Sequence, residues 1–333
     1  MLRSLFLLGL LAVACCARGE ELNAGRLGVI YNLDNASSAR IAREYAGLRR
    51  VPGENVIGLS IPATDRISRE ELRRLRDMML QKLPSAVQSL LLVWSKPYAV
   101  ECMSITTAFA AGYVPGFCEP GCARTAINPL FDTSGWLPAD TAGWLPAMLL
   151  PSADEALAQS VIQRGIRSDG SHPAGIAYLI RTQDASRNVR AVGYNDTESI
   201  AGNRVRVLQM RTPIDQALPQ ALTYFTGVSR VEELKHIIFL PGAAADHLTS
   251  TGGVLDGSGQ MSALEWLRQG ATASYGSVTE PCNHPGKFPS PAVFLDHYLR
   301  GETLLEAYWK SVAMPGQGLF IGEPLARPYA IRR

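Results

Sequence analysis

The sequence has little net charge, few aromatic side chains and only one long apolar run, at its very start. Its 333 residues include 32 Lys and Arg against 30 Asp and Glu, which leaves a net charge of +2. Binding to nucleic acid needs a concentrated excess of basic residues, so we expect no nucleic-acid partner. With 47% hydrophobic residues the chain can bury a sizeable core, which excludes bulk disorder.

The first 17 residues have the composition of a secretory signal peptide. Arg3 is followed by an apolar run and then by small residues. Residues 12–15 (Ala-Val-Ala-Cys) also resemble a bacterial lipobox, in which Cys15 would carry the lipid anchor. Both interpretations predict an exported protein, periplasmic or extracellular, either free or tethered to a membrane through Cys15. No later apolar run is long enough to cross a bilayer, so we expect no transmembrane segment in the mature chain.

Four cysteines remain once Cys15 and Cys16 are assigned to the leader or anchor: Cys102, Cys118, Cys122 and Cys282. An even number in an oxidising compartment predicts two disulfides, with three alternative connectivities. The pair Cys118 and Cys122 has no second pair of ligands nearby, as a structural zinc site would require. We therefore expect structural disulfides, no metal site and no cofactor.

Strand and helix patterns alternate along most of the chain. Apolar runs predict strands near residues 26–33, 55–61, 89–94, 175–182, 236–240 and 271–275, with amphipathic helices between them. Such repeated units predict an α/β fold with a mainly parallel sheet covered by helices on both faces. We expect a single domain from residue 24 to 333, with an irregular, disulfide-pinned insertion at 97–151.

Polar side chains follow most of the predicted strands. The carboxyl ends of parallel strands meet at one edge of a sheet, where ligands commonly bind. This placement predicts a ligand pocket at that edge. The candidate binding residues are Asn32, Asp34, Ser95, Lys96, Asp184, Arg187, Tyr275 and Lys287.

The loops expected after residues 240 and 275 carry the residue types of nucleophilic catalysis. Asp246, His247 and Ser250 offer a carboxylate, a base and a hydroxyl nucleophile, and Glu280 and Cys282 offer a carboxylate and a thiol. A structural interpretation is open for both loops: a Gly-rich turn capped by side chains for the first, and half of a disulfide for Cys282. The even cysteine count favours the disulfide.

Several segments resemble a family of exported bacterial proteins found chiefly in genomes that carry exosortase, the PEP-CTERM sorting system. The resemblance rests on residues 240–253 (LPGAAADHLTSTGG), 266–281 (WLRQGATASYGSVTEP), 306–312 and 322–325. This family has no known activity, so the resemblance implies export and no mechanism.

A fainter similarity, in strand layout, is to caspase-like cysteine peptidases of the gingipain type, which implies a three-layer α/β sandwich. The sequence departs from their catalytic pattern, because no Gly follows His247 and Cys282 lies beyond Glu280 and Pro281.

Two functions follow. The first is a non-peptidase relative of the caspase-like fold that binds a cell-envelope or extracellular ligand, such as a polysaccharide or a protein tail. The second is a cysteine-dependent peptidase or transpeptidase that uses His247 and Cys282.

Overall fold

The computed structural model describes residues 21–117, 122–257 and 259–331. The predicted leader, Cys15 and Cys118 lie outside these ranges. No helix in the described part is long and apolar enough to cross a membrane.

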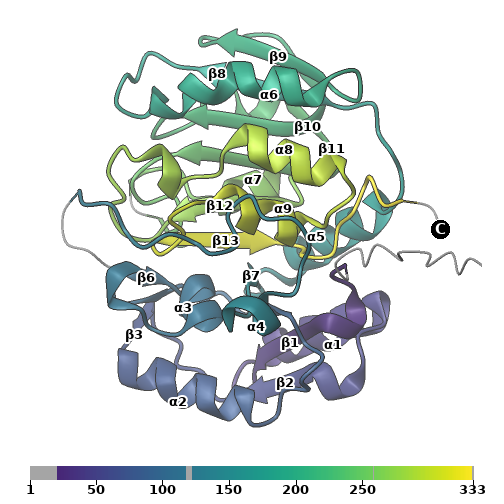
Figure 1. Ribbon diagram of the computed structural model, residues 1–333, viewed down its shortest axis with the longest axis vertical. Helices are drawn as coiled ribbons and strands as arrows, with labels where there is room; N and C mark the ends of the chain where they lie inside the picture. Colours follow the sequence, from purple (N-terminus) through teal and green to yellow (C-terminus); the bar gives the residue numbers. More distant parts are fainter. Residues whose placement is uncertain (1–20, 118–121, 258, 332–333) are drawn as a thin grey trace, which may run out of the picture.

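A ten-stranded sheet runs through the whole molecule (Figure 1). Its strand order is β2-β1-β4-β7-β13-β12-β11-β10-β8-β9. Their bounds are β1 Leu27–Asn32, β2 Val56–Leu59, β4 Ser89–Val93, β7 Ala147–Leu150, β8 Ile176–Arg181, β9 Arg206–Arg211, β10 Leu218–Gly227, β11 Ile237–Leu248, β12 Ala273–Ser277 and β13 Gly318–Gly322. A small second sheet contains β3 Arg66–Ile67, β5 Ala99–Val100 and β6 Met103–Ser104.

Helices cover both faces of the large sheet, which confirms the predicted α/β class. One row contains α1, α5 and α7, which contact one another in that order; the other helices include the neighbours α2 and α3, and the row α6, α8 and α9. The helices are α1 Ala36–Arg49, α2 Arg69–Leu80, α3 Ile105–Ala111, α4 Pro138–Ala142, α5 Glu155–Ser168, α6 Tyr194–Ala201, α7 Leu264–Gln269, α8 Pro291–Leu299 and α9 Leu304–Ser311.

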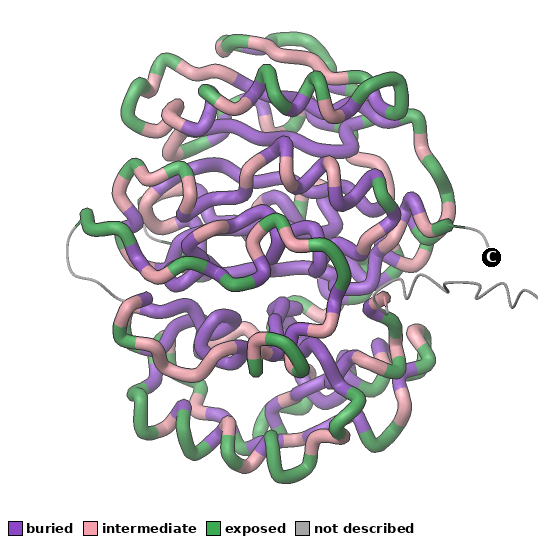
Figure 2. The backbone as a smooth tube through the Cα atoms, viewed as in Figure 1, coloured by how far each residue is buried: buried purple, intermediate pink, exposed green. Residues whose placement is uncertain are grey.

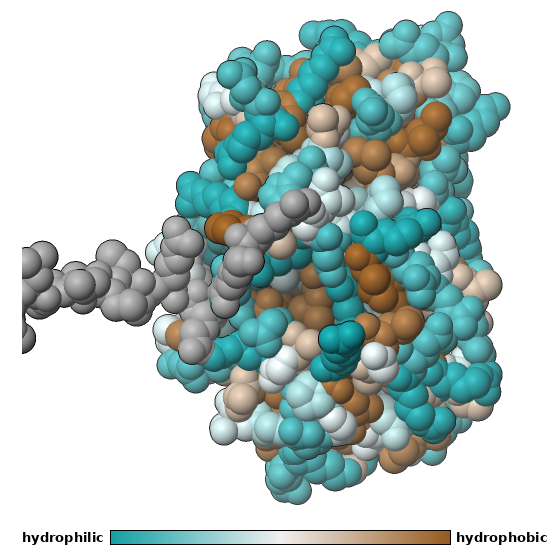
Figure 3. Space-filling model, turned by 90° about the vertical axis from the view of Figure 1, so that its right-hand side faces the viewer, coloured by the Kyte–Doolittle hydropathy of each residue, from teal (hydrophilic) through white to brown (hydrophobic). Residues whose placement is uncertain are grey.

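Burial follows this layering. The central strands β4, β7, β12 and β13 are buried at every residue, because helices cover both of their faces. Figure 2 shows the same pattern, with exposed residues on the outer helices and loops. On the face seen in Figure 3, hydrophobic residues lie in separate groups among hydrophilic ones, as is usual for a protein surface.

Strand β13 divides the sheet into two halves. β1, β2, β4 and β7 run parallel to one another, as do β8, β9, β10, β11 and β12, and β13, which is antiparallel to β12, lies between the two groups. The carboxyl ends of β4 and β11 lie at one edge of the sheet, because Lys96, just after β4, lies 2.7 Å from Asp256 in the loop after β11, and Arg66, after β2, donates to the carbonyl oxygen of Val278, after β12. The predicted strand-end residues of the two halves therefore face a common edge, although they are spread along it.

Strand β11 is longer than its sequence pattern indicates. The predicted strand ends near residue 240, but β11 continues to Leu248 and includes Asp246 and His247. The residues at 243–245 are all Ala and fully buried, which lets the strand pass between β10 and β12 beneath the helices. Apolar periodicity did not reveal this extension, because three small residues in a row carry no alternation.

The segment 97–151, expected to be irregular, contains regular elements. It holds α3, α4 and the strand β7, which lies between β4 and β13 in the large sheet. A disulfide between Cys122 and Cys282 joins this segment to the loop after β12. β7 was not predicted, because the segment is rich in Gly and Pro and only four residues form the strand.

Candidate functional site

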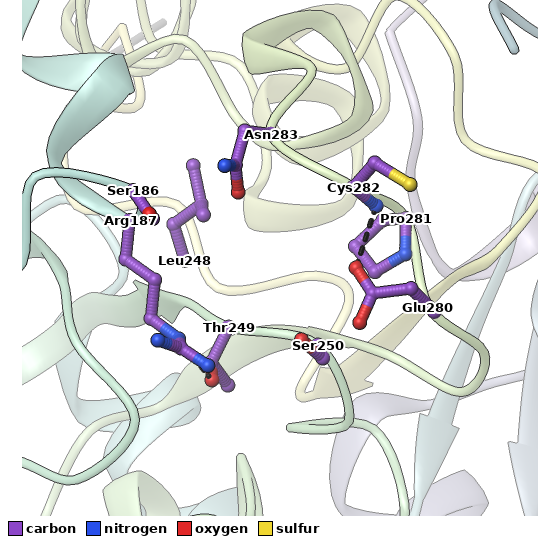
Figure 4. Close-up of a pocket in the computed structure, with 9 residues that line it drawn as sticks. All are labelled: Ser186, Arg187, Leu248, Thr249, Ser250, Glu280, Pro281, Cys282 and Asn283. Carbon is purple, nitrogen blue, oxygen red and sulfur yellow. Dashed lines mark hydrogen bonds between the residues drawn. The ribbon is translucent and has the colours of Figure 1, made fainter. Parts of the chain in front are cut away.

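A pocket of about 280 Å³ lies at the carboxyl ends of β8, β11 and β12. Three loops, which follow these strands, supply its walls (Figure 4). This is the edge of the half-sheet where loops from neighbouring parallel strands converge. The lining residues are Ser186, Arg187, Leu248, Thr249, Ser250, Glu280, Pro281, Cys282 and Asn283.

Arg187 links the loops after β8 and β11. Its Nη1 atom lies 2.7 Å from Oδ2 of Asp184, and its Nε atom donates to Thr249 Oγ1 at 3.2 Å. Thr249 in turn donates to Oε1 of Gln260 at 2.7 Å. The predicted binding residues Asp184 and Arg187 thus lie together at this edge, and the guanidinium is held by partners on both sides.

Glu280 and Cys282 form the opposite wall. Oε1 of Glu280 accepts a hydrogen bond from the backbone N of Cys282 at 2.8 Å. Cys282 is disulfide-bonded to Cys122, and Cys102 is also in a disulfide, as the even cysteine count predicts. A sulfur held in a disulfide is not a thiolate, so the intact bond denies Cys282 the role of nucleophile.

His247 is buried in β11 and fully hydrogen-bonded. Its Nε2 atom lies 3.0 Å from the carbonyl oxygen of Met261, and Nδ1 accepts from Nε1 of Trp266 at 2.9 Å. The ring is 0% exposed, and burial lowers the pKa of His247 to about 4. The imidazole is therefore neutral near pH 7, with both nitrogens engaged away from the pocket. This geometry gives no support to a role as general base.

Asp246 pairs with Arg190 in the protein core. The two side chains form a buried ion pair, and Nη2 of Arg190 also contacts the carbonyl oxygen of Asp246 at 3.3 Å. Burial raises the pKa of Asp246 to about 6, although Arg190 opposes this shift. Neighbouring strand residues point to opposite faces, so Asp246 and His247 do not act on one substrate atom.

Tyr275 and Lys287 lie behind the wall that Glu280 and Cys282 form. The hydroxyl of Tyr275 donates to the carbonyl oxygen of Lys287 at 2.6 Å, and burial raises the pKa of Tyr275 far above its usual value. Lys287 is 1% exposed, and burial lowers the pKa of its ammonium, with Glu280 opposing the shift. Neither residue lines the pocket.

The remaining predicted binding residues belong to the other half-sheet. Asn32 is buried and bonded to the backbone of Ile61 through both side-chain ends, and Asp34 accepts from Ser60. Ser95 accepts from the backbone N of Ala153 at 2.9 Å. These contacts hold the loops after β1, β2, β4 and β7 together, and none of the three residues lines the pocket.

Lys96 is the exception among them. Its Nζ atom lies 2.5 Å from Asp65 and 2.7 Å from Asp256, in the loop after β11. It therefore connects the two halves of the molecule.

A second pocket of about 520 Å³ adjoins the first at the ends of β8, β9 and β10. Asp184 lines it, whereas Arg187 lines the first pocket, so their ion pair stands between the two cavities. Its wall includes the apolar side chains of Pro213, Ile214 and Val228. Sequence reasoning missed these residues because β9 and β10 were not predicted as strands.

Sequence reasoning also passed over Ser186, Leu248, Pro281 and Asn283 in the first pocket. Each is within three positions of a residue that was predicted, so the loops were identified and their inward-facing members were not. No family model, no curated protein and no solved structure matches this chain.

Proposed function

We infer that the chain is an exported binding protein that holds a segment of another molecule in the two adjoining pockets and does not transform it. The observation that carries this proposal is the first pocket itself: polar side chains from three loops converge there, while its cysteine is held in a disulfide. The disulfides also support export, because such bonds persist in oxidising compartments. The similarity to caspase-like proteins stays an expectation about the fold, without the peptidase chemistry.

The size of the cavities favours a unit of a polymer. A volume of about 280 Å³ lies just below the range of about 300–1,000 Å³ that is typical for small-molecule sites. The neighbouring cavity of about 520 Å³ would receive the next unit along the same chain.

The chemistry of the walls favours a peptide over a polysaccharide. The first cavity offers Arg187, Glu280 and Asn283 to a polar side chain, and the second offers the apolar Ile214 and Val228 to a hydrophobic one. Among the described residues neither lining contains Phe, Tyr or Trp, whose faces commonly stack on sugar rings. We take the tail of an extracellular or cell-envelope protein as the ligand.

A random heptapeptide library displayed on phage tests this proposal. An enriched peptide, synthesised and labelled, should bind the purified protein in a fluorescence-polarisation titration. Ser250→Tyr, which fills the first cavity, and Val228→Arg, which places a charge in the second, should each weaken binding about tenfold or more, a change of about 1.4 kcal/mol. Ser199→Tyr, on the exposed surface of α6, is the matched control.

Two results would contradict the peptide ligand. One is a library without enrichment, and the other is a peptide that binds Ser250→Tyr and Val228→Arg as well as the unmodified chain. Binding of soluble polysaccharides that these two variants abolish would instead assign the site to a saccharide. Hydrolysis of the peptide by the non-reduced protein would contradict a function limited to binding. It would indicate a hydrolase that does not use a free cysteine.

A further inference from the structure

A second cluster of polar side chains lies outside the pockets, where the segment 97–151 meets α8. Ligand atoms of Asp132, Asp296 and His297 all lie within 4.8 Å of one another. Asp132 is 165 positions from His297 in the sequence, so no local spacing could reveal the cluster and the sequence analysis expected no metal.

His297 stands between carboxylates at both ring nitrogens. Its Nδ1 atom lies 2.9 Å from Oε1 of Glu302, and its Nε2 atom lies 3.1 Å from Oδ1 of Asp132. The His297 side chain is 2% exposed, and these two carboxylates are the polar partners of its ring nitrogens.

A neutral imidazole carries one proton and can satisfy only one of these two carboxylates. With that proton on Nδ1 and donated to Glu302, the lone pair of Nε2 faces an oxygen of Asp132. Two acceptors at this distance need a proton or a cation between them. A carboxylate that fixes Nδ1 in this way, leaving Nε2 for a metal, is the usual arrangement around metal-binding histidines.

The surrounding charges allow a cation. Glu302 is held by Lys310, whose Nζ atom lies 2.8 Å from Oε2, and this contact fixes the carboxylate that orients His297. Asp296 is paired with Arg300 at 2.6 Å. The Arg300 side chain is 59% exposed, so it can release Asp296 into solvent at little cost.

We propose that Nε2 of His297 and the carboxylates of Asp132 and Asp296 bind a divalent transition-metal ion, Zn²⁺ or Mn²⁺, with Glu302 as the positioning residue for the ring. One imidazole with two carboxylates suits these ions better than Ca²⁺ or Mg²⁺, which prefer oxygen alone. The Asp132 side chain is 55% exposed, which leaves an entry path from solvent. The ion joins the segment 97–151 to α8, and its binding is independent of the function proposed for the pockets.

The test is calorimetric titration of the full mature chain, free of affinity tags and pretreated with chelator, with ZnCl₂ and with MnCl₂. One ion should bind per chain with either metal. Asp132→Asn, Asp296→Asn and His297→Gln should each weaken binding about tenfold or more, and Glu302→Gln, which acts through the ring, should weaken it by a smaller factor. The melting temperature should rise with the metal in the unmodified chain and not in His297→Gln.

Asp140→Asn and His172→Gln are the matched controls, because both are exposed, outside the cluster and of the same residue types. Asp132→Asn keeps the test decisive if His297→Gln fails to fold, since Asp132 is at the surface. Absence of saturable binding by both metals overturns the proposal, as does binding that Asp132→Asn and Asp296→Asn leave unchanged or that His172→Gln removes.

Discussion

At the scale of single residues, the chemistry predicted for the strand-end loops depends on which groups are free to react. Cys282 was both a candidate nucleophile and a candidate disulfide partner. The disulfide with Cys122 decides this question for the oxidised protein, and parity of the cysteine count was the signal that favoured it. His247, by contrast, could not be assigned from the sequence, because its partners Met261 and Trp266 follow it by 14 and 19 positions.

We predict that a thiol reagent leaves Cys102, Cys122 and Cys282 unmodified in the native, non-reduced protein. Cys122→Ser together with Cys282→Ser should lower the free energy of unfolding by about 2–5 kcal/mol, because the cross-link no longer restricts the unfolded chain. Mass spectrometry after labelling, and urea unfolding of the double variant, are the measurements. Stoichiometric labelling of Cys282 before reduction would instead support the cysteine-dependent hydrolase.

A second prediction concerns the pH dependence that His247 contributes. The pKa of His247 falls from 6.5 to about 4 on folding, so the unfolded chain binds more protons between these values and acidification destabilises the protein. Burial is the main cause; Arg187, Arg190 and Arg230 lower the pKa further, and the hydrogen bond to Met261 raises it. The loss amounts to about 3 kcal/mol across that range.

The contribution of Asp246 to the pH dependence of stability has the opposite sign. Its pKa rises from 3.8 to about 6 on folding, so acidification through this range stabilises the folded state. The two contributions offset each other in the unmodified chain. His247→Gln should be less stable at neutral pH, and between about pH 7 and pH 4.5 it should gain about 2.4 kcal/mol relative to the unmodified chain, measured by urea unfolding. An unchanged difference across this range, or the same gain in His172→Gln, would contradict the shift.

At the scale of elements, the sequence predicted those with strong local signals. The amphipathic spacing of residues 291–299 coincides with α8, and in the structure the side chain of Ser290 caps this helix by accepting from the backbone N of Val293. The amphipathic spacing of residues 303–312 extends one residue beyond α9 at each end, and Thr303 and Glu306 form a capping box at the start of this helix. The sequence analysis did not predict β7, β9 or β10 as strands. β7 has only four residues, and β9 has no fully buried residue to give an apolar pattern.

Two glycines in helices, Gly47 and Gly165, differ in the space that is available for a side chain. Gly47 lies on the exposed side of α1, where an added Cβ would meet nothing within 4 Å, whereas a Cβ on Gly165 in α5 would lie 2.3 Å from Oε2 of Glu323. That carboxylate is 0% exposed and is held by Tyr45 at 2.7 Å and by Arg49 at 2.6 Å, so it cannot move away freely.

Gly47→Ala should therefore stabilise the protein by about 0.5–1 kcal/mol through helix propensity. Gly165→Ala has the same propensity gain but should destabilise by about 1–3 kcal/mol, because the methyl group overpacks the contact with Glu323. Thermal and urea unfolding of both variants are the measurements. Stabilisation by Gly165→Ala equal to that of Gly47→Ala would show that α5 does not press against Glu323.

At the scale of the whole molecule, the position of β13 in the sheet is the feature that local patterns could not predict. The repeated strand and helix patterns predicted parallel strands, which the structure confirms on either side of β13. The strand β13 comes from the end of the chain, lies between β7 and β12 and is antiparallel to β12, and only the complete topology shows this. Of the predicted strand-end residues, Arg187, Ser250 and Glu280 line the first pocket and Asp184 lines the second, whereas Asn32, Asp34 and Ser95, which follow strands on the far side of β13, line neither.

The same topology predicts that the two halves unfold together. Phe320 of β13 is 0% exposed; its ring stacks on Trp309 at 4.6 Å and packs edge-on to Tyr275 at 5.0 Å, so it joins the core on both sides of the boundary. Phe320→Ala should cost about 3–5 kcal/mol. Hydrogen exchange read by mass spectrometry should show protection falling by the same factor in β4 and in β10, which lie on opposite sides of β13. Loss of protection in one of these strands alone would mean that β13 does not couple the halves, and the pocket at the ends of β8, β11 and β12 would then belong to a unit that unfolds independently of the β1–β4 half.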